Sequence, residues 1–386
     1  MNFNLTEEQR QLKETARKFA RQELVSVAKE MEETDEPMSD ACRRRLGEMG
    51  FLGVNIPQEY GGLGLTTFDA VLVLEELAQI SPAVAFPVFE SCFGPSQSIL
   101  HCASEAIKRR VLPRVCAGEL IVAVTMSEPE AGSAMTDLTT RGEIRGDKVV
   151  INGQKRWCSG AGHSGGYLLY CRMADKPGAA GVGAIYLELG TPGMSFGKRE
   201  RLMSMRGVPS RDIFFDNVEV PAENIVVPVG KFKDLMTTFS VERCGNTTMA
   251  VGGAAGALEY AVQYVQERKQ FGKPIIEFQA VQMRLADMAM RVEAARLLLY
   301  RAAANASAGI PSLRDISIAK CYANETSREV CANGVQLMGG YGINKDYGME
   351  QRLRDSFAWG IGGGTIDIQK TNIAAELVGR RFDQRR

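Results

Sequence analysis

The sequence predicts an α+β protein in which a strand-rich segment lies between two helical segments. Apolar residues recur every three or four positions before residue 120 and after residue 229, whereas 121–228 holds short runs rich in Val, Ile, Leu, Phe and Tyr. Such segregation is typical of α+β folds rather than of alternating parallel-sheet folds. We therefore expect three domains: N-terminal helical (1–120), middle antiparallel β (121–228) and a C-terminal four-helix-type bundle (229–386).

The composition is that of a globular enzyme, with 45% hydrophobic and 24% charged residues in a chain of 386. Lys+Arg and Asp+Glu both total 46, so no net charge favours nucleic acid or an anionic membrane. We find no signal peptide and no apolar run long enough to span a membrane. Nine scattered cysteines without a CxxC pair, and only two histidines, indicate free thiols, no metal site and a cytoplasmic location.

The N-terminal helices are expected from their caps and their apolar spacing. Thr6 and Gln9 have the spacing of a capping box at the start of the first helix. The segment AVAFPVFESCFGP is apolar and aromatic, and we expect it to be a connector. The expected order is a helix from Thr6, helices over 43–49 and 67–80, the connector at 83–95 and a helix-rich run to about Gly118.

After Ile121 the spacing of the apolar residues changes, which predicts strands. Beyond Pro228 the helical spacing returns, which predicts the C-terminal helices. The hairpin turn Arg145-Gly146-Asp147 is expected between two strands. The expected strands contain 149–153, 166–173, 181–189 and 212–221, and they stop near Pro228. The expected C-terminal helices include one with a buried face over 281–299, one over 313–338 that ends at the loop 339–342, and one over 365–380.

The stretch from Ser240 to Gly272 is expected to form one long helix, because small and apolar residues recur there at steps of three and four. If it is helical throughout, Glu242 near its start and Phe271 near its end lie roughly 40 Å apart, at about 1.5 Å per residue. That distance is too large for one small active site. The two ends must therefore serve different places or different subunits.

Four motifs along the chain resemble those of one family. They are Val122–Ser133 (VAVTMSEPEAGS), Lys155–Ser159 (KRWCS), Arg268–Gly272 (an R-x-x-F-G) and Gln336–Gly342 (a Q-x-x-G-G-x-G). In this order they resemble the acyl-CoA dehydrogenase family over essentially the whole chain. The resemblance implies an FAD-dependent enzyme that oxidises an acyl-CoA and passes electrons to an electron-transfer flavoprotein.

The resemblance also assigns residues to FAD. Small residues let backbone N–H groups approach the cofactor, and Trp157 is a rigid aromatic suited to a flat flavin ring. Taken alone, Trp157 could be a core residue, Gly132 a turn glycine and Arg268 a solvated arginine. The assigned residues are Met126, Ser127, Gly132, Ser133, Trp157, Ser159, Arg268, Phe271, Gln336, Gly339, Gly340, Thr365 and Asp367.

In this family the R-x-x-F-G arginine and the glycine loop reach the FAD of a neighbouring subunit. A permanently charged, forked guanidinium suits a pyrophosphate. The resemblance therefore implies a homodimer, and further a dimer of dimers, that is, a homotetramer. This arrangement would explain why the two ends of the long helix lie so far apart.

The usual catalytic base of the family is missing from this chain. Many members place a glutamate in a segment like Y-E-G-T-x-x-I-Q, whose counterpart here is Gly362–Gln369, with Gly363 at the position of the base. Some members take the base from the start of the long helix, at a position that matches Glu242. A positioned, desolvated carboxylate is sufficient, because the flavin and the thioester acidify the α carbon. Alternatively, Glu242 is a helix-terminus acid or pairs with Arg243.

Two alternatives to Glu242 as the base remain open. Glu90 lies among Phe86, Phe89 and Phe93, where its pKa should be raised, and resembles the acid of cyclic-acyl-CoA dehydrogenases that act on a remoter ring carbon. Otherwise Glu90 faces solvent or partners an arginine. In the second alternative no α proton is removed, as in relatives with a similar glycine-rich segment that eliminate a sulfinate with the help of a connector arginine. Phe86 and Pro87 stand near that place, which disfavours this alternative.

Gly363 can still contribute its backbone N–H, which in the family binds the thioester carbonyl. The volume that its missing side chain leaves suits a branched or cyclic acyl group. Arg243, Arg206 and Ser133 are the expected substrate-binding residues; an unpaired surface arginine is the alternative for Arg206. The expected function is α,β-dehydrogenation of an acyl-CoA in fatty or alicyclic acid catabolism. Alternatives are a cyclic enoyl-CoA 1,4-dehydrogenase that uses Glu90, a desulfinase or lyase, an enoyl-CoA reductase and a non-catalytic binding protein.

Overall fold

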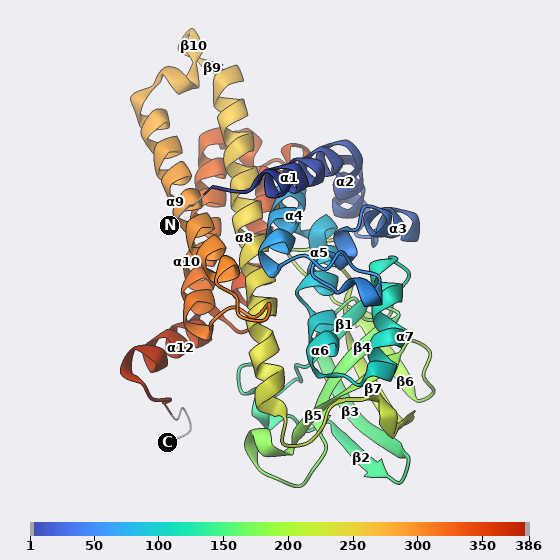
Figure 1. Ribbon diagram of the computed structural model, residues 1–386. Helices are drawn as coiled ribbons and strands as arrows, with labels where there is room; N and C mark the ends of the chain where they lie inside the picture. Colours follow the sequence, from blue (N-terminus) through green and yellow to red (C-terminus); the bar gives the residue numbers. More distant parts are fainter. Residues whose placement is uncertain (1–3, 383–386) are drawn as a thin grey trace.

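The computed structural model describes residues 4–382 and has the expected order of helices, strands and helices. Figure 1 shows the N-terminal helices packed at one side of a long central helix, the sheet below them and the C-terminal helices on the other side. The α+β prediction is confirmed.

The N-terminal helices begin at the residues their caps predict. The Thr6 side chain accepts a hydrogen bond from the Gln9 amide and the Gln9 side chain binds the Thr6 amide, which completes the capping box. The helices are α1 (Glu7–Phe19), a π-helical turn (Ala20–Leu24), α2 (Val25–Thr34), α3 (Asp40–Glu48), α4 (Thr67–Ile80), α5 (Pro82–Cys92), α6 (Pro95–Cys102) and α7 (Glu105–Cys116).

The segment expected to be a connector is helical, so this prediction was wrong. Ser81 caps α5, Pro82 occupies its first turn, where proline is tolerated, and Pro87 lies inside it. Every residue of α5 is buried. Because proline usually ends a helix, Pro87 made a helix unexpected here.

The middle segment forms an eight-stranded sheet with the order β6-β7-β3-β2-β4-β5-β8, and β1 pairs with β4. Most pairs are antiparallel as expected, but β1 and β2 both run parallel to β4. The expected turn at 145–147 joins β2 to β3, with Gly146 at φ +63°. The strands are β1 (Val122–Thr125), β2 (Arg141–Arg145), β3 (Lys148–Ser159), β4 (Gly166–Arg172), β5 (Val182–Glu188), β6 (Met194–Arg199), β7 (Ser210–Pro221) and β8 (Ile225–Val227).

The long helix α8 (Phe232–Glu267) begins earlier and ends earlier than the sequence predicted. Arg268 is extended, and β9 (Lys269–Gln270) and β10 (Lys273–Pro274) form a hairpin after it. Phe271 and Gly272, at the tip, have φ values of +52° and +81°. Helical continuation to Gly272 was therefore a wrong prediction, because two left-handed residues form a hairpin turn that no α-helix accommodates.

Small residues along α8 allow other helices to approach closely. A methyl group on Gly252 would lie 2.6 Å from the Cβ of Ala78 in α4, and one on Gly245 would collide with Phe93 at the end of α5. Figure 1 shows α8 running from the sheet to the β9–β10 hairpin, beside α9 and α10. The remaining helices are α9 (Gln279–Ala304), α10 (Leu313–Met338), α11 (Met349–Asp355) and α12 (Ile366–Val378).

Within residues 4–382, none of the helices has both the length and the apolarity required to cross a membrane. All nine cysteines lie in this part of the chain and are free thiols, seven of them buried.

Candidate active site

Glu242 and Gly363 face each other between α8 and the loop before α12. A methyl group built on Gly363 would lie 3.4 Å from Glu242 Oε1 and 3.2 Å from Lys320 Nζ of α10. The carboxylate therefore borders the space that a side chain at 363 would occupy.

The loop Gly362–Gly364 is held by buried side chains from three helices. Lys320 Nζ donates to the carbonyls of Gly362 and Gly364, at 2.5 and 2.8 Å. Asn246 Nδ2 of α8 donates to the Gly362 carbonyl at 3.2 Å, and Gln369 Nε2 of α12 to the Gly364 carbonyl at 3.1 Å. Among the described residues the Gly363 amide has no hydrogen-bond partner.

Burial shifts the pKa values of the two ionisable groups here toward their neutral forms. It raises the pKa of the Glu242 carboxyl to about 7, although Lys320 and Arg243 oppose the shift. It lowers the pKa of the Lys320 ammonium to about 7, with a further contribution from Arg243. A carboxylate with a pKa near 7 is present in its basic form at neutral pH and can still hold a proton, as a general base requires.

Glu90 lies in α5, is 4% exposed and does not face solvent. Its Oε2 has no hydrogen-bond partner in the described part of the chain, so no arginine pairs with it there. Burial, and secondarily the Glu242 carboxylate, raises the pKa of Glu90 well above its usual value. The two carboxyls therefore share one electrostatic environment.

The three residues expected to bind substrate lie in different surroundings. Arg243 is buried next to Glu242; burial lowers its pKa, and its Nε is unpartnered among the described residues. Arg206 is not an unpaired surface residue, because its Nε donates to the Glu32 carbonyl at 2.6 Å at the end of α2. Ser133 is exposed on the segment between β1 and β2.

The segment Met126–Ser133 is fastened to β3 by a buried ion pair. Lys155 Nζ donates to the Met126 carbonyl and to Glu128 Oε1, both at 2.8 Å. Burial alone would raise the pKa of Glu128, but Lys155 and hydrogen bonds from Thr139 and Thr140 lower it to about 2. Beyond this anchor Gly132 is open, since no described atom lies within 4 Å of where its Cβ would stand.

Trp157 is an exposed aromatic in a strained position of β3. Its backbone has φ +61°, at the register shift between Lys155 and Cys158, and 51% of its surface is exposed. The Arg156 guanidinium lies 4.3 Å from the ring centroid. Trp157 is therefore not a core residue, and its ring can receive a flat ligand. Ser159, two residues on, is half-buried and pairs with Ser210 of β7.

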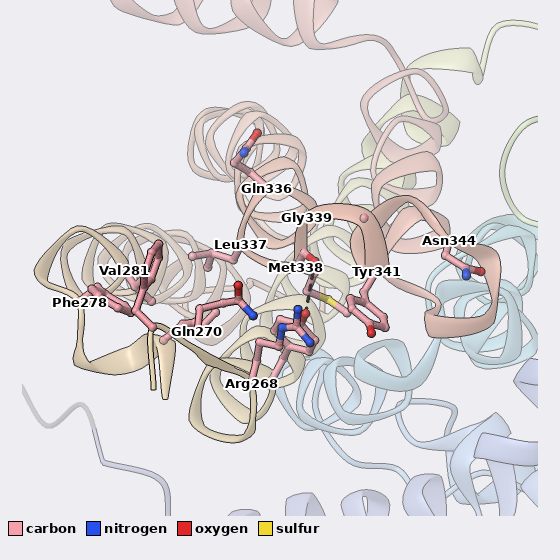
Figure 2. A pocket seen from close by; sticks show the side chains of 14 residues that line it. Arg268, Gln270, Phe278, Val281, Gln336, Leu337, Met338, Gly339, Tyr341 and Asn344 are labelled. Carbon is pink, nitrogen blue, oxygen red and sulfur yellow. Dashed lines mark hydrogen bonds between the residues drawn. The ribbon is translucent and has the colours of Figure 1, made fainter. Parts of the chain in front are cut away.

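The two motifs at the far end of α8 meet in one groove of about 570 Å³. Figure 2 shows Arg268 and Gln270 from the end of α8 and the hairpin opposite Gln336, Gly339 and Tyr341 from the end of α10. The Arg268 guanidinium lies 5.2 Å from the Tyr341 ring centroid. Phe271 also lines the groove and is 93% exposed, which leaves a large apolar ring in solvent in the isolated chain.

The structure thus gathers the predicted residues into separate places. Glu242, Arg243 and Gly363 lie together, and Thr365 caps α12 directly after them, with Asp367 in its first turn. Arg268, Phe271, Gln336, Gly339 and Gly340 line the distant groove. Glu242 and Glu267 are separated along a continuous helix by roughly 38 Å, at about 1.5 Å per residue.

Sequence reasoning missed Lys320, Asn246 and Gln369, and it gave no role to Glu128 and Lys155. One signal could have revealed Lys320. It lies on the buried stripe of α10 between Ile316 and Ala323, where a lysine must find partners. Nothing in the sequence showed that those partners are the carbonyls of a glycine loop.

The order of helices, sheet and helices, together with these sites, is that of a class of flavoenzymes built from three parts. Comparison with protein families agrees with this classification. The acyl-CoA dehydrogenase N-terminal domain matches residues 6–119, the middle domain residues 123–218 and the C-terminal domain residues 232–378. The chain belongs to the acyl-CoA dehydrogenase family.

Two curated relatives match over nearly their whole lengths. The 3-sulfinopropanoyl-CoA desulfinase of Paraburkholderia xenovorans (strain LB400) is 37% identical, over 100% of this chain and 99% of the relative. An acyl-CoA dehydrogenase of Bacillus subtilis (strain 168) is 34% identical, over 98% of this chain and 100% of the relative.

Several solved structures share the fold at lower sequence identity. Butyryl-CoA dehydrogenase from Megasphaera elsdenii has a TM-score of 0.94 at 32% identity, over 98% of this chain and 100% of that chain. A chain in a structure of the electron transferring flavoprotein of Acidaminococcus fermentans has a TM-score of 0.94 at 33% identity, with the same coverage. The FAD complex of PigA has a TM-score of 0.92 at 27% identity, over 98% and 99% of the two chains.

Proposed function

We propose that this protein is an FAD-dependent acyl-CoA dehydrogenase in which Glu242 removes the α proton. One observation carries the proposal: the Glu242 carboxylate borders the space left by the absent side chain at 363, where it has a pKa near 7. A base must lie within reach of the proton it abstracts and have a pKa close to the working pH. Among the described residues, Glu242 is the carboxylate beside Gly363 whose pKa lies close to neutral pH.

The surfaces assigned to FAD fit the cofactor. Gly132, Gly339 and Gly340 have open space on their Cβ side within the described chain, and Trp157 presents an exposed ring. Trp157 and the segment Met126–Ser133 would hold the flavin in one subunit, while Arg268 and Gln336 would bind the cofactor of a dimer mate. A bound FAD would supply the acceptor for the β hydrogen, which leaves the acyl group as hydride.

The chain's own residues supply the remaining steps. The Glu242 carboxylate takes the α proton, and the C–H electron pair forms the α,β double bond as the β hydrogen leaves. The unpartnered Gly363 amide donates to the thioester carbonyl and stabilises its developing negative charge. Arg243, beside Glu242, favours the ionised carboxylate. We expect Ser133 to contact both substrate and cofactor, whereas Arg206 joins its loop to α2.

We propose a branched or cyclic acyl group as substrate, because position 363 carries no side chain where many family members have a glutamate. We further propose an electron-transfer flavoprotein as acceptor, a homotetramer and a cytoplasmic location. The similarity to a chain in the Acidaminococcus fermentans flavoprotein structure supports the acceptor, and the exposed Phe271 supports association between subunits.

Anaerobic titration tests the function directly. Branched and cyclic acyl-CoA thioesters should bleach the flavin absorbance faster than butyryl-CoA or octanoyl-CoA. Glu242→Gln should bind FAD normally and reduce it at least 10²-fold more slowly, because general-base catalysis contributes about that much. If Glu242→Gln stays active while Glu90→Gln does not, the base is Glu90, and the burial and raised pKa of Glu90 would then support 1,4-dehydrogenation of a cyclic enoyl-CoA.

Desulfination is the second candidate, favoured by the 37% identity to the Paraburkholderia enzyme and by the glycine-rich segment 362–364. The discriminating substrate is 3-sulfinopropanoyl-CoA. Release of sulfite from it without bleaching of the flavin would establish elimination in place of oxidation.

A further inference from the structure

We propose that Lys320 is a positioning residue that fixes the direction of the Gly363 amide N–H, the donor assigned above to the thioester carbonyl. The inference rests on the proposed function, which it extends to a residue outside the family motifs. It also makes a claim about the loop alone, which can be measured without turnover.

The geometry of one peptide group carries the argument. The Gly362 carbonyl and the Gly363 N–H belong to the same planar peptide, which is trans, as are all peptides of the described chain. In a trans peptide the C=O and the N–H point in opposite directions. Lys320 and Asn246 both donate to this carbonyl, so together they aim the N–H of Gly363 away from themselves.

The loop needs such an external restraint. Three successive glycines have more backbone freedom than any other tripeptide, and Gly363 and Gly364 adopt φ values of +64° and +86°. Without the contacts on its carbonyls, the loop would sample many conformations and the amide would seldom face the substrate. An amide fixed in advance loses no reorganisation energy at the moment of reaction.

A lysine at position 320 can hold the loop better than an uncharged side chain that only fills the same volume. Its nitrogen reaches the carbonyls on both sides of Gly363, and its side chain is fully buried. Asn324 Nδ2 donates to the Lys320 carbonyl at 2.9 Å and to Asn246 Oδ1 at 3.4 Å, which couples the two donors.

The charged and titratable groups around Lys320 and Glu242 come from several elements. They are Arg243 on α8, Cys321 on α10, Glu90 on α5 and Tyr170 on β4. Lys320 retains two N–H donors even when its amine is neutral, so both carbonyl contacts persist across its titration.

The first test measures the loop itself. We compare wild type, Lys320→Met and the matched control Lys370→Met, whose exposed lysine on α12 pairs with Glu325. Hydrogen exchange of a peptide covering 358–368 should be at least 10-fold faster in Lys320→Met and unchanged in Lys370→Met. Asn246→Ala, which removes one of the two donors to Gly362, should give a smaller increase.

The second test measures the reaction. In Lys320→Met, kcat for flavin reduction should fall about 10²-fold, as when one oxyanion donor is lost, while FAD stays bound and KM changes less than 3-fold. The inference would be overturned if the loop of Lys320→Met exchanged hydrogen as slowly as that of wild type. It would also be overturned if the loop exchanged faster while kcat stayed at the wild-type value. If Lys320→Met does not fold, Asn246→Ala decides between the same outcomes.

Failure of the proposed function is distinguishable from failure of this inference. If no acyl-CoA bleaches the wild-type flavin, the dehydrogenase assignment fails. The exchange experiment then still shows whether Lys320 restrains the loop, and a loop as protected in Lys320→Met as in wild type would overturn that part of the inference.

Discussion

At the scale of single residues, Glu242 lies ten residues after the first residue of α8, so it is not a helix-terminus acid. The helix dipole acts within the first turn and cannot account for its pKa. Burial accounts for it, because desolvation disfavours the carboxylate. The buried environment of Glu242 therefore suits a general base and does not fit the alternative of a helix-terminus acid.

Flavin reduction should depend on pH through this carboxyl. The rate constant should rise with pH and level off above an apparent pKa near 7, since only the ionised Glu242 accepts a proton. Stopped-flow reduction between pH 5.5 and 9 measures it. Stability should change with pH in the direction opposite to the rate. Because the pKa of Glu242 is raised in the folded state, its contribution to the free energy of unfolding is complete below pH 4.5 and is lost as pH rises through about 7. A rate that falls across this range would contradict the assignment.

Gly363→Ala should weaken both fold and function. Its φ of +64° disfavours an L side chain, and the methyl group would lie 3.2 Å from Lys320 Nζ and 3.4 Å from Glu242 Oε1. We expect a loss of about 1 kcal/mol in the free energy of unfolding, measured by urea denaturation. Gly362→Ala, which lacks a positive φ, is the control and should be milder.

Residues at this site differ in how far the sequence could predict them. Glu242 was identified because a known motif lacks its glutamate, and the structure places its carboxylate at that gap. Lys320 and Asn246 could not be assigned, because their partners are backbone carbonyls more than 40 positions away. Hydrogen bonds to a loop carbonyl leave no pattern in the sequence.

At the scale of elements, the β1–β2 segment depends on the buried pair of Glu128 and Lys155. Removing one partner of a buried pair leaves an uncompensated charge and typically costs about 3 kcal/mol. Glu128→Gln should therefore lower the melting temperature and weaken FAD binding, measured by calorimetry and by flavin fluorescence. Glu130→Gln, at an exposed position of the same segment, should leave both unchanged.

Elements with a recognisable cap and a helical spacing of apolar residues were predictable, whereas elements interrupted by proline or by a left-handed residue were not. The bounds of α4 and α10 agree with the sequence prediction because each begins at a side-chain cap, Thr66 or Ser312, and then keeps a helical apolar spacing. The helix α5 was missed because Pro87 lies inside it, and proline usually ends a helix. The end of α8 was misplaced because Phe271 adopts a left-handed backbone, which only its structural context reveals.

At the scale of the whole molecule, α8 separates Glu242 from Arg268 by most of its length, so one FAD cannot contact both within a single chain. Hybrid dimers test the sharing of sites between subunits. Glu242→Gln and Arg268→Gln homomers should each be strongly impaired. A hybrid of the two carries one site with both native residues, so co-expressed and separately tagged subunits should recover up to half of the wild-type activity.

The control for this experiment combines both substitutions in one chain and pairs it with a single Glu242→Gln chain. Every site in that hybrid lacks the Glu242 carboxylate, so it should remain inactive. Recovery there, or no recovery in the first hybrid, would show that the far groove does not serve a neighbouring cofactor.

The position of Glu242 inside a helix has a consequence for how substrate range can change. A base on a catalytic loop moves whenever the loop is altered, whereas the proposed base Glu242 is fixed by a helix packed against α4 and α5. On this proposal, the residues that border the acyl group can be exchanged without displacing the proton acceptor. Variation at positions facing Gly363, with Lys320 and Glu242 retained, is the practical route to enzymes of this type with altered acyl preference.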